Sequence, residues 1–277
     1  MRKSNGVRFL FLPPACLSLM LAWLALVTSP SPAQEKGKKP PAESKHVLFI
    51  GNSYTFRNGL PNMIAELAKA GKEIPLTVES ETPGGCTLEK HWTDGKALAK
   101  IKSRKWDFVV LQEQSTSILQ HRDSTFNHAK LFDAEIKKNG STTILYMTWA
   151  RQGKPDDQRA ISGAFLDLSK ELKCPIAPVG EAWDAALKAD KERVLHADDM
   201  THPSPTGTYL AACVFYATIY GKSPEGLPGK IENTMVSKPK TAATGDTRAD
   251  KFLSRLKDDE ALPLQTIAWK AVQAIKK

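Results

Sequence analysis

The feature that most constrains the fold of this chain is the alternation of short apolar runs with longer segments of helical periodicity. Five apolar runs lie at residues 46–51, 76–79, 107–112, 142–148 and 175–179. Helical periodicity is found between and after them, at 60–71, 87–103, 124–139, 157–172 and 181–190. Strands that are apolar along their whole length and alternate with helices are typical of a parallel sheet covered on both faces. The pattern predicts an α/β fold, a three-layer α/β/α sandwich with a five-stranded parallel sheet.

The rest of the chain is expected to complete the same domain. A further apolar helix is expected in "SPTGTYLAACVFYATIYG", where Ser204 can cap the start and Gly221 suits the exit. Residues 222–246 are rich in Pro, Gly, Lys and Thr and are interpreted as a surface excursion. Residues 247–277 are expected to form C-terminal helices. With no internal repeat and no second core, residues 46–277 are predicted to be a single domain.

The N-terminal segment has the layout of a secretory signal. Residues 1–33 begin with the basic "MRKSNGVR", continue with an apolar run and end at Ala33, a suitable small residue for cleavage. Residues 34–45 are rich in Pro and Lys and are expected to be a flexible leader. We therefore expect a secreted or periplasmic protein, without stable membrane insertion after signal cleavage. An uncleaved membrane anchor is the alternative, which Pro13 and Pro14 within the run disfavour.

The charge of the chain argues against nucleic acid as a partner. The formal net charge is +9 over 277 residues and falls to +6 without the predicted signal. The lysines are scattered, and no basic stripe is interleaved with aromatic residues.

Three cysteines follow the predicted signal, Cys86, Cys174 and Cys213. Their odd number, irregular spacing and lack of a CxxC motif indicate neither a disulfide framework nor a zinc knuckle. One disulfide with one free thiol, or three buried thiols, remain alternatives.

Polar and glycine-rich segments follow the predicted strands, at the sheet edge where ligands bind in open parallel sheets. They are Gly51-Asn52-Ser53, Pro83-Gly84-Gly85-Cys86-Thr87, Gln112-Glu113-Gln114-Ser115 and Thr148-Trp149-Ala150-Arg151. A lone serine after a strand is also a good helix cap. However, "HADDMTHPSPTG" supplies Asp199 and His202 three residues apart, so that the carboxylate can orient the imidazole. Ser53 is therefore a candidate nucleophile with His202 as its base.

These segments resemble the sequence blocks of the SGNH, or GDSL-type, hydrolase family. The first strand ends in Gly-Asn-Ser, a glycine follows the second strand, an amide follows the third, and "DMTHPSPTGTYLAA" supplies a late DxxH. The blocks occur in the family's order over roughly residues 46–221. The resemblance implies a flavodoxin-like SGNH hydrolase fold and an exported serine esterase without cofactor or metal.

The resemblance also implies a role for each site residue. Ser53 would be the nucleophile, His202 the general base and Asp199 the group that fixes the imidazole tautomer. The oxyanion hole would consist of the backbone N–H groups of Ser53 and Gly85 and the side-chain amide of Gln114. Ester cleavage would proceed through an acyl-enzyme that water then hydrolyses.

The sequence departs from the family pattern in two places. Gly-Asn-Ser-Tyr replaces Gly-Asp-Ser-Leu, and Gln114 lies where an asparagine is expected. Gln112 is a second candidate for the oxyanion donor, whereas Glu113 is expected to face solvent. Asp198 competes with Asp199 for the orienting role, and the DxxH spacing favours Asp199.

The sequence indicates the substrate less directly than the type of reaction. An O-acyl group such as acetyl on a carbohydrate is preferred, with Trp149 stacking on a sugar or acyl group and Arg151 holding an anion. The alternatives are a lipid ester or thioester, or an inactive carbohydrate-binding module on the same fold. A metal site of His196, Asp198 and His202 is disfavoured.

Overall fold

The computed structural model describes residues 43–234 and 251–275. The predicted signal over 1–33 and all but the end of the predicted leader lie outside the described residues. So does part of the expected excursion over 222–246.

The core of the fold is a five-stranded sheet in which every neighbouring pair of strands is parallel. The spatial order is β2-β1-β3-β4-β5, the order of a flavodoxin-like doubly wound sheet. The strands are β1 (Lys45–Ile50), β2 (Leu76–Glu81), β3 (Phe108–Leu111), β4 (Thr142–Tyr146) and β5 (Ile176–Ala177). The predicted five-stranded parallel sheet is confirmed.

The central strand β1 shows why these strands are apolar on both faces. Val47 and Phe49 belong to the core on one side of the sheet, and Leu48 and Ile50 to the core on the other side. Because successive side chains of a strand point to opposite faces, only a continuous apolar run can fill both cores.

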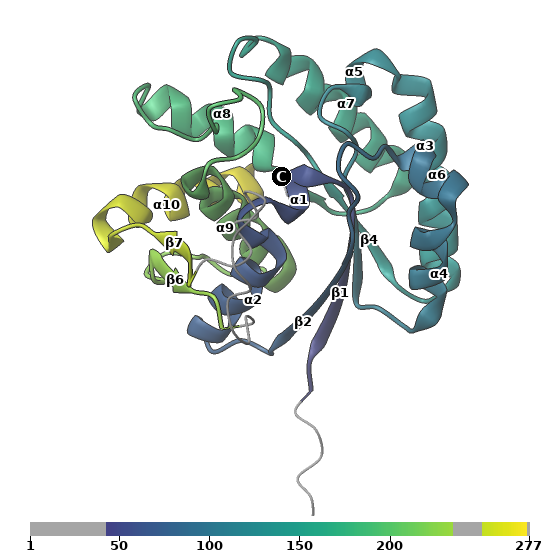
Figure 1. Ribbon diagram of the computed structural model, residues 1–277, viewed down its shortest axis with the longest axis horizontal. Coiled ribbons are helices and arrows are strands. Elements are labelled where there is room, and N and C mark those ends of the chain that lie inside the picture. The colour runs from purple at the N-terminus through teal and green to yellow at the C-terminus, as the bar shows by residue number, and fades with distance from the viewer. Residues whose placement is uncertain (1–42, 235–250, 276–277) are drawn as a thin grey trace, which may run out of the picture. The chain divides into compact units, whose positions relative to one another are not determined.

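Helices cover both faces of the sheet (Figure 1). One layer contains α2 (Leu60–Ala70), α8 (Val179–Ala189), α9 (Pro205–Tyr220) and α10 (Asp258–Ile275). The other contains α3 (Leu88–Asp94), α4 (Lys96–Ser103), α6 (Arg122–Lys138) and α7 (Asp157–Leu172). The short helices α1 (Ser53–Phe56), η1 (Arg57–Gly59) and α5 (Ser117–Gln120) follow the ends of β1 and β3. This is the predicted three-layer α/β/α arrangement.

Helix α9 begins and ends as the sequence predicts. The Ser204 hydroxyl accepts a hydrogen bond from Gly207 N at 3.1 Å, and Gly221 ends the helix in the left-handed region with φ of 67°. The helix packs against α2, α8 and α10, which explains why it is apolar nearly all round.

Two expectations about the helices are corrected. The helix expected over 87–103 is divided into α3 and α4 by Gly95, whose φ of 72° interrupts the helical backbone. The C-terminal region expected to be helical contains a strand, β7 (Phe252–Arg255), followed by one helix rather than two.

Strand β7 pairs antiparallel with β6 (Lys230–Glu232), which lies within the expected surface excursion. Leu253 is buried against the helical layer that contains α9, whereas the Phe252 ring lies close to the cationic groups of Lys230 and Arg255. So short a segment fits helical and strand periodicity equally well. Pairing with β6, which lies outside this segment, decides that residues 252–255 form a strand.

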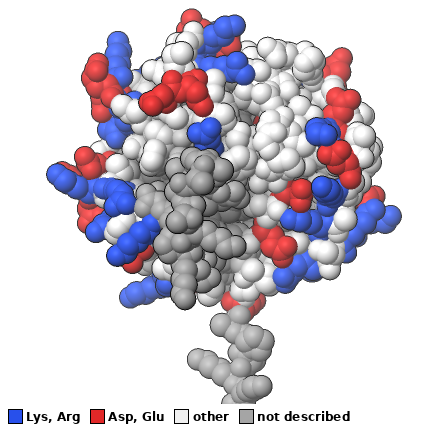
Figure 2. All heavy atoms as spheres, in the orientation of Figure 1, with Lys and Arg blue, Asp and Glu red and all other residues white. Residues whose placement is uncertain are grey.

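Figure 2 shows lysine and arginine side chains interspersed with aspartate and glutamate on the viewed face. Over residues 43–234 and 251–275, no helix combines the length and the apolar character needed to cross a membrane.

Candidate active site

Ser53 is the first residue of α1, immediately beyond the carboxyl end of β1. The cap of this helix is Asn52, whose Oδ1 accepts a hydrogen bond from Tyr54 N at 3.0 Å. The Ser53 hydroxyl is therefore not used as a cap. Its Oγ lies 2.7 Å from His202 Nε2.

His202 and Asp199 reach Ser53 from the loop that precedes α9. His202 Nδ1 lies 2.6 Å from Asp199 Oδ2, on the opposite side of the ring from the serine. If Nδ1 carries the proton and donates it to the carboxylate, Nε2 is the acceptor for the serine hydroxyl. The structure thus brings together the three residues that the sequence proposed as nucleophile, base and orienting acid.

A tight turn holds the Asp199 carboxylate in place. Its Oδ1 accepts hydrogen bonds from Thr201 N at 3.0 Å and His202 N at 2.8 Å, and Met200 adopts a φ of 59° between them. Partial burial raises the pKa of the Asp199 carboxyl, but the hydrogen bonds from His202 and Thr201 outweigh it and hold the pKa well below its usual range. Asp199 is therefore ionised at neutral pH. Both Asp198 and Asp199 are exposed, and it is the Asp199 carboxylate that contacts the His202 ring.

The hydrogen bonds of Asn52 explain why the first block has Gly-Asn-Ser rather than Gly-Asp-Ser. The residue is 2% exposed, and its Nδ2 donates to Cys86 O at 2.9 Å while its Oδ1 accepts from Tyr54 N. An aspartate could not donate to the Cys86 carbonyl. This bond ties the serine segment to the turn containing Gly85, whose φ is 67°.

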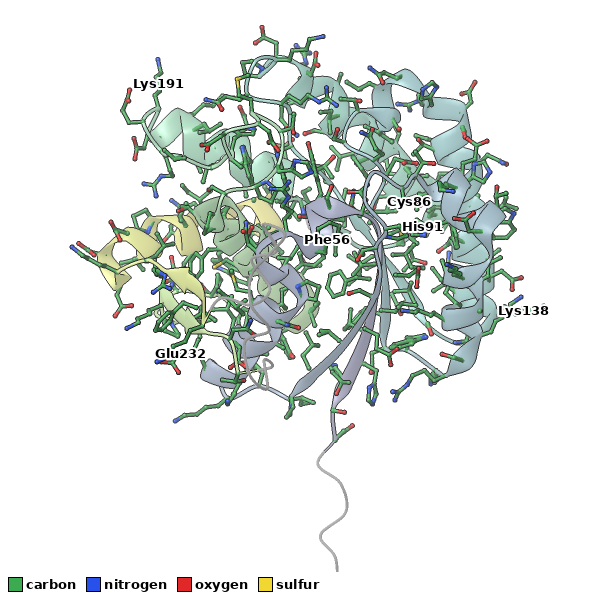
Figure 3. The ribbon with its side chains drawn as sticks, viewed as in Figure 1. Phe56, Cys86, His91, Lys138, Lys191 and Glu232 are labelled. Carbon is green, nitrogen blue, oxygen red and sulfur yellow. The ribbon has the colours of Figure 1, made fainter. Side chains whose placement is uncertain are left out.

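A buried histidine that the sequence did not single out supports the same edge of the sheet. His91 on α3 donates from Nε2 to Gly51 O at 2.7 Å, and burial lowers its pKa, which favours the neutral ring. Figure 3 labels His91 and Cys86, which lie near each other on the α3 side of the sheet. Gly51 itself is required by packing, because a Cβ there would lie 2.5 Å from Gln112 Oε1.

The geometry distinguishes the two glutamines that compete as oxyanion donors. Gln112 is fully buried; its Oε1 accepts from Asn52 N and Thr55 Oγ1, and its Nε2 donates to Glu113 O. Both ends of its amide are engaged. Gln114 is partly exposed, and its Oε1 accepts from the Thr116 N–H at 3.2 Å.

The donors at this edge that have no hydrogen-bond acceptor among the described residues include the N–H groups of Ser53 and Gly85 and Nε2 of Gln114. These are the groups that the sequence proposed for an oxyanion hole. Glu113, expected to face solvent, is instead 3% exposed and hydrogen-bonded.

Trp149 does not line a cleft, so the expectation that it stacks on a substrate is wrong. It is 1% exposed, and both ring faces are covered, by Tyr54 at 4.7 Å and by Trp183 at 4.1 Å between ring centres. Its Nε1 donates to Thr201 O at 3.0 Å. Trp149 therefore supports the loop that carries Asp199.

Arg151, the other expected substrate contact, is exposed at the rim of a cavity of about 520 Å³ next to Asp199. The lining of this cavity includes Leu119, Gln120, Arg151, Lys154, Asp157 and Met200. Arg151 Nη2 donates to Ser115 Oγ at 3.3 Å, one residue from Gln114. No carboxylate in the described part of the chain forms an ion pair with Arg151 or Lys154.

The residues considered for a metal site have other partners. His196 Nε2 lies 3.0 Å from Ala150 O, and His202 contacts Ser53 and Asp199. Among the described residues, no group of three or more His, Cys, Asp or Glu side chains is arranged to hold a metal ion. Cys86, Cys174 and Cys213 are free and buried, which is one of the two alternatives left open by the sequence.

Comparisons with known proteins find structural similarity only. No profile of a known protein family matches the chain, and no curated sequence matches it. A Slackia heliotrinireducens protein described as a candidate SGNH hydrolase is 26% identical, with a TM-score of 0.55, over 64% of this chain and 100% of that one. A DUF4886 family protein from Bacteroides uniformis is 18% identical, with a TM-score of 0.61, over 85% of this chain and 97% of that one. The chain has the SGNH hydrolase fold.

The resemblance to SGNH hydrolases inferred from the sequence blocks is therefore confirmed, as is the expected fold class. An acetyl xylan esterase of the same fold is 18% identical, with a TM-score of 0.52, over 63% of this chain and 99% of that one. Structures with the SGNH hydrolase fold thus include proteins described as hydrolases and as esterases.

The sequence singled out neither His91 nor the supporting roles of Gln112 and Glu113, three buried polar residues around the candidate site. His91 bonds to Gly51 O and Gln112 to Asn52 N, in the segment that leads to Ser53. Glu113 accepts from the N–H of Gln114. The available signal was the position of Gln112 and Glu113 directly after a buried strand, where a polar side chain is costly unless it is hydrogen-bonded.

Proposed function

We propose that this protein is a serine hydrolase that cleaves an ester bond through Ser53, His202 and Asp199. The observation that carries the proposal is the chain of contacts from Ser53 Oγ to His202 Nε2 at 2.7 Å and from His202 Nδ1 to Asp199 Oδ2 at 2.6 Å. A hydroxyl is a weak nucleophile until a base accepts its proton, and this arrangement supplies an oriented base.

The reaction follows from these contacts. Ser53 Oγ attacks the ester carbonyl carbon while its proton passes to His202 Nε2. The resulting imidazolium is stabilised by Asp199 and then protonates the departing alcohol as the C–O bond breaks. Water attacks the acyl-enzyme, giving its proton to Nε2, and the acid leaves as Ser53 regains its hydrogen. The three free donors beside the serine would hold the oxyanion in both steps.

Gln114 and Gln112 are expected to respond differently to substitution. Gln114→Ala should lower kcat by roughly 10²-fold with little change in KM, because a donor to the oxyanion acts mainly in the transition state. Gln112→Leu should instead lower the free energy of unfolding by about 1–3 kcal/mol for each buried donor, on Asn52 and Thr55, that loses its acceptor. Steady-state kinetics and urea denaturation measure the two effects. A larger kcat loss in Gln112→Leu, with Gln114→Ala unaffected, would reverse the assignment.

For the substrate, we propose an O-acyl group, such as acetyl, on a carbohydrate outside the cytoplasm. The support is the secretory layout of residues 1–33, the polar and charged residues among those that line the cavity beside Asp199, such as Gln120, Arg151 and Lys154, and the acetyl xylan esterases that share the fold. Trp149 no longer contributes to this argument because both of its faces are covered. A lipid ester or thioester is the second candidate, since Leu119 and Met200 also line the cavity.

Arg151 is proposed to bind an anionic group of the substrate. Arg151→Gln should raise KM about tenfold or more for an acetylated oligosaccharide bearing a uronate, since a hydrogen bond to a charged group contributes about 1.5–3 kcal/mol. The matched neutral oligosaccharide is the control and should keep its KM. Equal effects on both substrates would show that Arg151 does not recognise the anion.

The proposed function is tested by a fluorophosphonate probe followed by peptide mass spectrometry, together with acetate release from acetylated xylo-oligosaccharides. A covalent adduct on Ser53 is expected and is incompatible with an inactive binding module. Preferred cleavage of long-chain p-nitrophenyl esters over acetylated oligosaccharides would favour the lipid alternative. Absence of both adduct and hydrolysis would overturn the proposal.

A further inference from the structure

Glu113 is a buried carboxylate beside the proposed oxyanion hole, and it has no role in the proposed hydrolysis. Its Oε1 accepts a hydrogen bond from Gln114 N at 2.6 Å. The N–H of Leu88 lies 3.3 Å from Oε1 and 3.4 Å from Oε2, and Thr125 Oγ1 donates to Oε2 at 3.2 Å. Among the described residues, neither lysine nor arginine forms an ion pair with Glu113.

Burying a charged carboxylate in this environment lowers the stability of the fold, because the charge loses its hydration. Burial raises the pKa of the Glu113 carboxyl, and the hydrogen bonds from Gln114, Leu88 and Thr125 oppose that rise. Replacing buried charged groups with apolar side chains of similar size is often neutral or stabilising. Stability alone therefore does not account for an acidic residue at this position.

The partners of Glu113 belong to two loops that the sheet does not join. Leu88 opens α3, three residues after Gly85, on the chain that leaves β2. Gln114 follows β3. Because β2 and β3 lie on opposite sides of β1, no strand ladder connects their ends. One carboxylate bonds to backbone N–H groups of both loops.

We propose that Glu113 is a positioning residue that fixes the Gly85 N–H and the Gln114 amide relative to each other, so that both reach the same oxyanion. Donors of this kind act only when they are held close to the position that the oxyanion takes. Glu113 therefore acts on the transition state through other groups, without touching the substrate. This inference rests on the proposed serine hydrolase function.

The test combines Glu113→Gln with Gln114→Ala in a double-mutant cycle. Glu113→Gln keeps the side-chain shape but leaves one neutral amide oxygen for both N–H groups, which binds them more weakly than a carboxylate, and places an NH₂ group at the Oε2 position, 3.4 Å from Leu88 N. We expect kcat to fall about 10- to 100-fold, with KM within about twofold of the wild type. The inhibition constant of a boronic acid that forms a tetrahedral adduct should rise in parallel with the kcat loss. The kcat loss should be smaller in the Gln114→Ala background than in the wild type.

Thr125→Val is the matched control, because it removes one donor to Glu113 and leaves the bonds to both loops. It should lower thermal stability but keep kcat within about twofold. If Glu113→Gln does not fold, Glu113→Asp takes its place, since it keeps the charge but is one methylene too short to reach both loops. It should show the same kcat loss.

The outcomes separate this inference from the proposed function. An unchanged kcat in a folded Glu113 variant, or an equal loss in both backgrounds, overturns the positioning role while an inactive Ser53→Ala leaves the proposed function intact. Activity retained in Ser53→Ala overturns the proposed function itself.

Discussion

Ser53→Ala is expected to lower kcat for ester hydrolysis by at least about 10⁴-fold, the loss typical when a serine hydrolase loses its nucleophile. The reason is local: Ser53 Oγ is the hydroxyl that contacts His202 Nε2, and Asn52 rather than Ser53 caps the following helix. The substitution should therefore leave stability nearly unchanged. Kinetics on p-nitrophenyl acetate and thermal unfolding measure the two quantities.

Ser103→Ala is the matched control, because Ser103 is an exposed serine at the end of α4. It should keep full activity and full fluorophosphonate labelling, whereas Ser53→Ala should lose both. Retention of activity in Ser53→Ala, within tenfold of the wild type, would exclude Ser53 as the nucleophile.

Asp199→Asn should lower kcat by about 10³- to 10⁴-fold. The Oδ1 side of residue 199 must remain an acceptor, because the N–H groups of Thr201 and His202 point to it. The new amide would then present its NH₂ group to His202 Nδ1. The imidazole proton would move to Nε2, which could no longer accept the proton of Ser53.

The control for Asp199→Asn is Asp198→Asn, the same change one residue earlier at an exposed side chain. It should leave kcat within about twofold of the wild type. The pair decides between the two aspartates that the sequence offered. A large loss in Asp198→Asn with full activity in Asp199→Asn would contradict the contacts at 2.6 and 2.8 Å.

Much of the architecture could be predicted because it depends on local periodicity. Apolar runs such as 46–51 must be strands buried on both faces, and helices must alternate with them to cover the sheet. Strand β7 could not be predicted, because its formation depends on pairing with β6 on the other side of the segment 235–250.

For the candidate site, the sequence by itself determined which residue types lie after each strand, and hence that Ser53 and a distant DxxH could meet at one edge of the sheet. Only the tertiary structure decided what surrounds them. It buried Trp149 between two rings, engaged both ends of the Gln112 amide, and placed Glu113 between two loops. The physical reason is that burial and hydrogen-bond partners are set by neighbours from other strands and helices, which no local pattern records.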